Sequence, residues 1–275
     1  MKHFKMTALA ACAVLAFGFA ACSSDDDSSS NNSGYIGTKS PSKAKAVGDI
    51  VFSDGSATPY REGSELTEVQ KSKAIAVIFY VGTELNSDVD GVADTTTTRT
   101  LGVGLVHDKH IWCTESANAV NINITTIQCP HSGSSGTLTF TGDKNGSDNL
   151  EQIAAYLVAN GSSDDTEIEE NYPAFYFAKK YATREGSHVS GTDYEKGWYL
   201  PTVAELFQLW KNRYVVVDAN RLCQGTEFVW SPVAGYYSSS QLGWEKGYAY
   251  CLTFYGDWKM VPKTDWEYLC AVREF

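Results

Sequence analysis

The sequence predicts an α+β fold, in one domain over residues 47–275. Three observations support this prediction. Short β-branched and aromatic runs recur between turn signals, helical stripes are few, and no segment repeats. At 275 residues and 43% hydrophobic, the chain is long enough to build a substantial core.

The sequence of the first half of the domain predicts mainly strands. AVGDIVFSDGS (46–56) predicts a strand that ends in the Asp54-Gly55 turn, and KAIAVIFYVG (73–82) is continuously apolar, as in a central strand. RTLGVGLVHDKHIWC (99–113) predicts another strand, GTLTFTG (136–142) alternates, and residues 83–98 between the two long strands predict an exposed loop.

Two helices are expected next. Asp148 and Glu151 have the spacing of a capping box, and Gly161 is placed to end the helix that follows. A second helix is predicted after Pro173. The apolar stripes that predict the two helices comprise Leu150, Ile153, Ala154, Leu157 and Val158 in the first, and Phe175, Ala178 and Tyr181 in the second.

GWYLPTVAELFQLWKNR (197–213) carries the strongest local signals and predicts a strand that turns sharply into a helix. Trp198 is expected in the core. Pro201 pushes the residue before it out of helical space, so the strand must end there. Thr202 and Glu205 predict a capping box, and this structural role for Glu205 is favoured over that of a catalytic acid. Leu206, Leu209 and Trp210 form the expected buried stripe.

Residues 1–21 predict a lipoprotein signal peptide. Lys2 and Lys5 precede a short apolar stretch that ends in Phe19-Ala20-Ala21-Cys22. This end resembles a bacterial lipobox, which implies that Cys22 is lipidated; an ordinary secretory signal cut nearby is the alternative. Two or more acyl chains hold a protein to a bilayer far better than one. Cleavage removes two lysines and no acidic residue, so the net charge falls from −11 to −13.

Residues 22–46 predict a flexible polar tether, because they contain few apolar side chains. The Asp25-Asp26-Asp27 run resembles the signals that export some lipoproteins to the outer face of the outer membrane, although a solvated spacer would read the same way. We therefore expect a lipid-anchored, surface-exposed protein of the outer membrane. The acidic balance argues against a nucleic-acid partner.

Five cysteines remain after Cys12 and Cys22 are set aside, and an odd number leaves at least one thiol outside any internal disulfide. Cys113 and Cys129 lie near His110 and His131, but this spacing matches no zinc family, so a disulfide or two buried thiols is preferred. The loop TGDKNGSDN (141–149) has the composition of a calcium loop with its glycine misplaced. No metal site and no cofactor is expected.

A family resemblance rests on GWYLPTVAEL, then YYSSS, YAYCLTFYGD and the terminal CAVREF. Together these resemble the DUF1566 family of bacterial lipoproteins, strongly over residues 172–275 and less over 47–171. The chain departs from the family pattern at Tyr199 and Tyr237. The resemblance implies a C-type-lectin-like fold with twisted antiparallel strands, two or three flanking helices and long loops. The same fold serves formylglycine-generating enzymes and the variable proteins of diversity-generating retroelements.

The resemblance favours a binding module over an enzyme. Formylglycine-generating enzymes hold copper with a close pair of cysteines, for which Cys251 and Cys270 are the available candidates. An oxidase of that type is one alternative function, and a structural envelope lipoprotein without a specific ligand is a second. The motifs of calcium-dependent lectins are missing, and no nucleophile elbow or dinucleotide loop occurs. His107 and His110 lack a matching acid–base partner and are expected at the surface or in turns.

Aromatic residues are enriched near the C-terminus, with 13 in the 48 residues 228–275. Tyrosine and tryptophan give large contact area at low entropy cost, so an aromatic loop surface predicts binding of an external protein or glycan. Strand alternation puts Tyr248, Tyr250, Leu252 and Phe254 on one side of a strand, and this side is apolar enough to face the core. The expected ligand-binding residues, on one exposed face, are Trp244, Glu245, Tyr255, Asp257, Trp258, Asp265, Trp266 and Tyr268.

Overall fold

The structure is a computed structural model that describes residues 34–89 and 92–275. The predicted signal peptide, Cys22 and the aspartate run lie outside the described residues. Within them, no helix is both long enough and apolar enough to cross a membrane.

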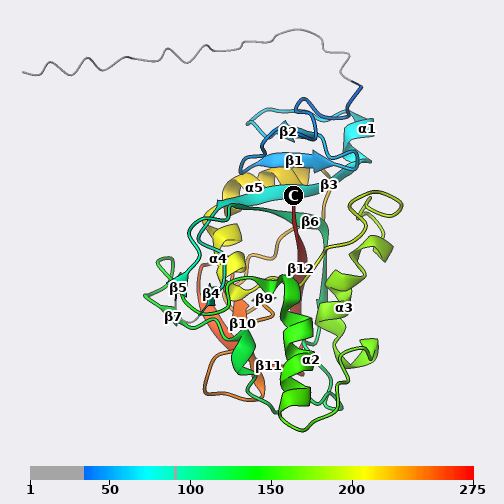
Figure 1. Cartoon of the computed structure of the whole chain (residues 1–275). Helices are drawn as coiled ribbons and strands as arrows, with labels where there is room; N and C mark the ends of the chain where they lie inside the picture. The colour runs from blue at the N-terminus through cyan, green and yellow to red at the C-terminus, as the bar shows by residue number, and fades with distance from the viewer. Residues whose placement is uncertain (1–33, 90–91) are drawn as a thin grey trace, which may run out of the picture. The chain divides into compact units, whose positions relative to one another are not determined.

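An eight-stranded sheet forms the centre of the fold (Figure 1). Adjacent strands of the sheet pair antiparallel, except β9 and β12, which pair parallel. In spatial order the strands are β11 (Trp258–Pro262), β10 (Tyr248–Leu252), β9 (Tyr236–Tyr237), β12 (Glu267–Glu274), β6 (Arg99–His110), β3 (Ala74–Gly82), β1 (Asp49–Phe52) and β2 (Ala57–Pro59).

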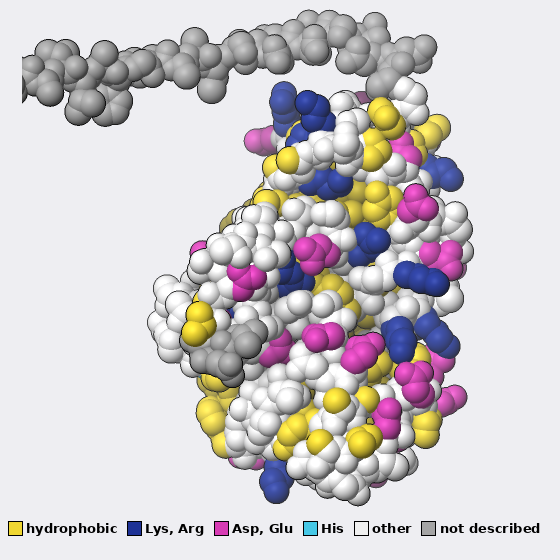
Figure 2. All heavy atoms as spheres, viewed as in Figure 1, with side chains coloured by type: hydrophobic (Ala, Val, Ile, Leu, Met, Phe, Trp, Pro, Cys, Tyr) yellow, Lys and Arg dark blue, Asp and Glu magenta, His cyan; other side chains and the backbone are white. Residues whose placement is uncertain are grey.

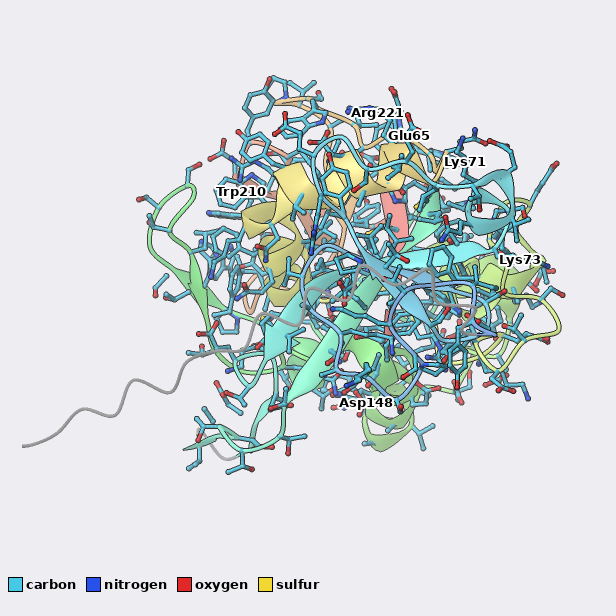
Figure 3. All side chains as sticks on the ribbon, turned by 90° about the horizontal axis from the view of Figure 1, so that it is seen from above. Glu65, Lys71, Lys73, Asp148, Trp210 and Arg221 are labelled. Atoms are coloured by element: carbon cyan, nitrogen blue, oxygen red, sulfur yellow. The ribbon has the colours of Figure 1, made fainter. Side chains whose placement is uncertain are left out.

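Helices cover both faces of this sheet, which makes three layers (Figure 3). One face carries α2 (Asn149–Ala159) and α3 (Pro173–Lys179), and the other carries α4 (Val203–Lys211) and α5 (Arg213–Leu222). Because both faces are buried, β3 is apolar without interruption. The predicted α+β class is confirmed.

Short elements complete the described chain. Two small hairpins join β4 (Asp88–Val89) to β5 (Val92–Ala93), and β7 (His131–Ser132) to β8 (Thr139–Phe140). The one-turn helix α1 (Glu68–Lys71) precedes β3. Single 3₁₀ turns are η1 (Thr125–Ile127), η2 (Gly146–Asp148), η3 (Glu169–Asn171) and η4 (Tyr181–Thr183).

The predicted tether extends too far, because the folded unit already includes residues 34–46. Lys39 forms a β-bridge with Ala57, and its ammonium pairs with the buried carboxylate of Asp49 at 2.6 Å. The backbone N–H of Gly37 donates to Ser56 Oγ at 2.7 Å. The segment lies alongside β2 and covers what would otherwise be an open sheet edge. Its polar composition concealed this, since the pairing is made mainly by backbone groups.

The capping box predicted at Asp148 is wrong. Asp148 occupies the N-cap position of α2, but its side chain accepts no cap hydrogen bond and instead accepts from Gln152 at 3.0 Å. The turn η2 precedes the helix and is capped by Asn145, whose side chain accepts from the N–H of Ser147. The chain therefore starts its helical path one turn earlier than the spacing predicts.

All five cysteines in the described residues are buried free thiols. Cys113 and Cys129 pack into the hydrophobic clusters on opposite faces of the sheet, so the alternative of two buried thiols is the one observed. Burial raises the pKa of the Cys113 thiol to about 12. Thiols with such a raised pKa are poor nucleophiles at neutral pH.

Candidate ligand-binding site

The strand-to-helix turn at 197–205 has the geometry that the sequence predicts. Tyr199 pairs antiparallel with Val272 of β12, and Thr202 and Glu205 form a complete capping box at the start of α4. Trp198 is buried, and its indole N–H donates to the Tyr194 carbonyl at 2.7 Å. The turn thus joins the segment paired with β12 to α4, which packs on one face of the sheet.

Glu205 does more than cap the helix. Its carboxylate is fully buried; Oε1 accepts from Arg99 at 3.0 Å and from the Tyr199 hydroxyl at 2.8 Å. Oε2 accepts from the backbone N–H of Thr202 at 2.8 Å. Burial raises the pKa of Glu205, opposed by the neighbouring Arg99 guanidinium. With no route to solvent, this carboxylate acts as a structural tie between α4 and β6.

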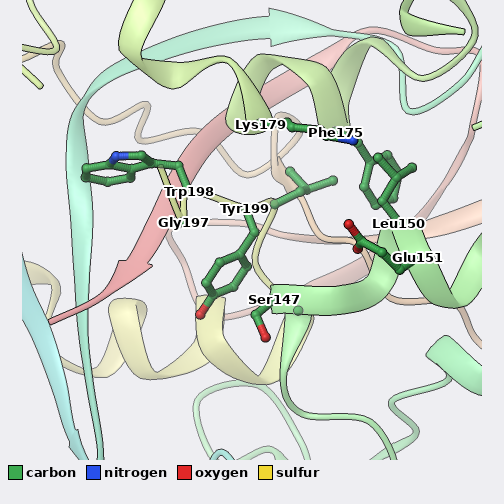
Figure 4. Close-up of a pocket in the computed structure, with 10 residues that line it drawn as sticks. Ser147, Leu150, Glu151, Phe175, Lys179, Gly197, Trp198 and Tyr199 are labelled. Atoms are coloured by element: carbon green, nitrogen blue, oxygen red, sulfur yellow. The ribbon is translucent and has the colours of Figure 1, made fainter. Parts of the chain in front are cut away.

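A cleft of about 250 Å³ lies beside this turn, between α2 and α3 (Figure 4). The extended segment Gly197–Leu200 forms one side of it. Leu150 and Phe175 form apolar walls, and Glu151 and Lys179 stand at the rim. Figure 2 shows the same face of the molecule, where acidic and basic side chains are interspersed over α2 and α3.

The predicted ligand-binding residues do not share one face, so that part of the prediction is wrong. Trp244 precedes β10 and Tyr255 follows it, which separates them by a strand about 17 Å long. The ring of Trp258 packs on His131, on the side of α4 and α5. Trp266 stacks on His110 beside Phe177, on the side of α2 and α3.

The same residues do reach solvent to different degrees. Trp244, Tyr255 and Trp266 are more than half exposed, whereas Trp258 and Tyr268 are half-buried. The three carboxylates that were expected to orient a ligand are exposed: Glu245, Asp257 and Asp265. Exposure therefore leaves them available for contact, but as separate surfaces.

The structure assembles a different aromatic surface, which we call the aromatic ladder: Phe207, Trp210, Arg213, Tyr214 and Trp230. Phe207 and Trp210 stack with ring centroids 5.2 Å apart. The Arg213 guanidinium lies 4.2 Å from the Trp210 centroid and 4.4 Å from that of Tyr214. Tyr214 in turn stacks on Trp230 at 6.1 Å. Figure 3 shows Trp210 on the side of the sheet covered by α4 and α5.

The outer end of the ladder is open to solvent. Tyr214 is 65% exposed and Trp230 is 42% exposed. The turn between β10 and β11 contacts the ladder through Phe254. The Trp210 indole N–H donates to the Phe254 carbonyl at 3.1 Å, and Trp230 packs edge-on against the Phe254 ring. Tyr255, one of the predicted residues, follows Phe254 and is exposed. Among the described residues, no carboxylate pairs with Arg213.

Sequence reasoning missed the ladder because its members come from separate segments. Trp210, Arg213 and Tyr214 surround the junction of α4 and α5, while Trp230 is sixteen residues further on. The available signal was WKNRY, with two aromatic residues and an arginine at helical spacing. Because the sequence predicts no helix after residue 213, this spacing did not indicate that the three side chains share one surface.

Two sites considered from sequence do not assemble. Cys251 packs on the α2–α3 side of the sheet and Cys270 on the other, so they cannot form a copper pair. In the calcium-like loop, the Asp143 carboxylate is buried and already accepts from the Ser87 hydroxyl at 2.5 Å and the Asn145 N–H. No cluster of three potential metal ligands occurs within 34–89 and 92–275.

Comparison with known proteins identifies a likeness of fold only. No family model matches the chain, and no curated protein matches it. A crystal structure described as a fimbrial protein from Bacteroides ovatus ATCC 8483 superposes with a TM-score of 0.56 at 17% sequence identity. The match covers 84% of this chain and 49% of that one, so this chain spans about half the length of the solved protein.

Proposed function

We propose that this chain is a surface-exposed lipoprotein of the outer membrane, whose C-type-lectin-like domain binds an external protein or glycan. The observation that carries the proposal is the aromatic ladder, whose outer rings are exposed and whose arginine pairs with no carboxylate of residues 34–89 and 92–275. The membrane attachment rests on the lipobox-like sequence before Cys22.

The physical chemistry of the ladder suits recognition. Tyrosine, tryptophan and arginine dominate the energetically important positions of protein interfaces. Stacking holds these side chains in place before a partner arrives, so little conformational entropy remains to be lost on binding. Exposed aromatic edges and an arginine fork also offer polar and apolar contacts to a sugar ring. A fimbrial protein is a component of the cell surface, and the likeness of fold to one supports a surface role.

The membership in the DUF1566 group and the kinship with diversified receptor-type proteins remain part of this proposal. They rest on GWYLPTVAEL and the motifs after it. Cys251 and Cys270 pack on opposite faces of the sheet, and burial raises the pKa of both thiols, which gives no support to an oxidase.

The test is a binding screen of the mature chain on immobilised glycans and on extracellular proteins, followed by single alanine variants. For a ligand of the ladder, Tyr214→Ala and Trp230→Ala should each weaken binding by about 2 kcal/mol, roughly thirtyfold in Kd. Both side chains are exposed, so the melting temperature should hardly change.

Trp244→Ala and Trp266→Ala are matched controls, since both remove an exposed tryptophan outside the ladder. Losses at these two positions with none at Tyr214 or Trp230 would place the ligand on the C-terminal loops instead. An absence of any ligand from both arrays would favour the structural envelope lipoprotein.

A further inference from the structure

A groove of about 420 Å³ lies between α4 and the two small hairpins (Figure 1). Its volume falls within the roughly 300–1,000 Å³ of most small-molecule sites. One side is a single face of α4, because residues three and four positions apart are neighbours on a helix surface. The residues of this face are Ala204, Phe207, Gln208 and Lys211. The other walls come from residues 83–85, 93–95 and 138–140.

The polar side chains of the groove have hydrogen-bonding capacity to spare. Glu84 is exposed, and within the described residues its carboxylate accepts one hydrogen bond, from Gln208 Nε2 at 3.3 Å. The Gln208 amide oxygen and the Lys211 ammonium have no hydrogen-bond partner among residues 34–89 and 92–275. Both side chains stand on a helix that is held by its capping box, so their backbone positions are fixed before a ligand arrives.

Apolar surface lies beside these polar groups. Phe140 is half-buried, and its ring centroid lies 5.6 Å from that of Phe207. Leu138 lines the same wall and is almost fully buried. A ligand in the groove would therefore contact an aromatic ring on one side and hydrogen-bonding groups on the other.

Charges of both signs line the groove, which limits the ligands that fit. Glu84 and Asp94 are acidic, and Lys144 and Lys211 are basic. Lys144 pairs with Asp88 at 2.8 Å, whereas Glu84 and Lys211 form no ion pair within the described chain. A charged ligand of either sign would meet a like charge in this space. A wholly apolar ligand would cover polar groups without pairing them, which costs free energy.

We propose that this groove binds one ring of a neutral saccharide. The C–H face of the ring packs on Phe140, and its hydroxyls donate to the Glu84 carboxylate and the Gln208 amide oxygen and accept from the Lys211 ammonium. A hydroxyl both donates and accepts, so it matches a site that offers both kinds of group. The groove shares Phe207 with the aromatic ladder and no other residue. It is therefore a second site, separate from the one on which the proposed function rests.

The test is an NMR titration of the mature chain with glucose, galactose, mannose and N-acetylglucosamine, and with glucuronate and glucosamine as charged probes. At least one neutral sugar should bind saturably and shift the signal of the Gln208 side-chain amide. Protons of the bound sugar should show nuclear Overhauser effects to the Phe140 ring. Both charged probes should bind more weakly than the neutral sugar. Saturable binding of none of the sugars, or tighter binding of a charged probe, would overturn the proposal.

Gln208→Ala should weaken sugar binding about fivefold, because it removes a hydrogen bond to the ligand. Gln152→Ala is the matched control. Gln152 is also a half-buried helical residue, and its amide donates to the Asp148 carboxylate at 3.0 Å, as that of Gln208 donates to Glu84. This control should leave the affinity unchanged within about twofold. Equal losses in the two variants would show that the groove is not the site.

Two further variants test the ammonium group and the separation from the ladder. Lys211→Ala should weaken sugar binding about threefold, whereas Lys73→Ala, which removes an exposed lysine outside the groove, should have no effect. Trp230→Ala should bind the sugar normally. A loss in Trp230→Ala with none in Gln208→Ala would place the sugar on the ladder, which would overturn this proposal and support the proposed function. A neutral peptide that shifts Gln208 where no saccharide does would assign the groove to a protein partner instead.

Discussion

Arg99 is a buried residue whose charge the core needs, because its guanidinium pairs with the buried Glu205 carboxylate at 3.0 Å. Its guanidinium is 3% exposed and also donates to the Leu85 carbonyl at 2.8 Å. Removing one partner of a buried ion pair leaves an uncompensated charge and typically lowers stability by about 3–5 kcal/mol. We expect Arg99→Met to lower the free energy of unfolding by that amount in urea titrations.

Glu274→Gln is the control for Arg99→Met. The Glu274 carboxylate contacts the same guanidinium at 3.2 Å, but its side chain is about half exposed. Exposed ion pairs contribute roughly 0–1 kcal/mol, so this variant should stay within about 1 kcal/mol of wild type. Equal effects of the two substitutions would mean that burial of the Arg99–Glu205 pair carries no special weight.

His107 should make stability depend on pH. It is buried against Phe228 and Tyr236, not at the surface as the sequence suggested, and neither ring nitrogen has a hydrogen-bond partner among the described residues. Burial lowers the pKa of His107 from 6.5 to about 4. The unfolded chain therefore binds this proton first, and the folded state loses on the order of 3 kcal/mol as pH falls from 6.5 to 4.

The comparison that isolates His107 is the difference in unfolding free energy between wild type and His107→Phe. The Asp143 carboxyl, whose pKa burial raises to about 6, acts in the opposite direction over this pH range, but it is common to both proteins. Between pH 6.5 and 4, the unfolding free energy of wild type should fall by about 3 kcal/mol relative to that of His107→Phe. A difference that is flat with pH would show that the buried imidazole accepts its proton as easily as a solvated one.

At the scale of elements, the strand–turn–helix unit at 197–211 should account for much of the stability of the second half. Trp198→Ala empties a position that is 4% exposed, and we expect a loss of about 3–5 kcal/mol. Thr202→Ala removes a buried cap whose hydroxyl also donates to the Lys144 carbonyl at 3.1 Å, and about 1–2 kcal/mol should be lost. Thermal and urea unfolding measure both, and a Trp198→Ala variant as stable as wild type would contradict the packing.

The elements that the sequence predicts correctly are those whose signals are local. The turn at Pro201 and the cap at Thr202 depend on neighbours three residues away, and both are found. The sequence does not predict helix α5, because RYVVVDANRL has three consecutive valines, which favour strands. Its helical form is stabilised by tertiary contacts: Val216 and Ala219 are fully buried, and Asn212 at its start donates to the Phe79 carbonyl.

At the scale of the whole molecule, long-range pairing is what local patterns could not supply. β6 pairs with β12 although Arg99 and Glu274 are 175 positions apart in the chain. The sequence of neither strand indicates which strand is its partner. The aromatic ladder and the cleft both arise from such juxtapositions. Composition did locate the aromatic enrichment, but only the folded arrangement assigns its rings to the core, to the ladder or to separate loops.

Attachment to the membrane is the last property at this scale, and it stays a prediction from Cys22 and the small residues before it. Cys22→Ser removes the thiol that would carry the lipid. The variant should remain unprocessed, or leave the detergent phase for the aqueous phase, since the described domain contains no membrane-spanning helix. Metabolic labelling with palmitate and detergent partitioning measure the two outcomes. Cys12→Ser, the same change inside the apolar stretch, should label and partition as wild type; unchanged labelling of Cys22→Ser would exclude the proposed anchor.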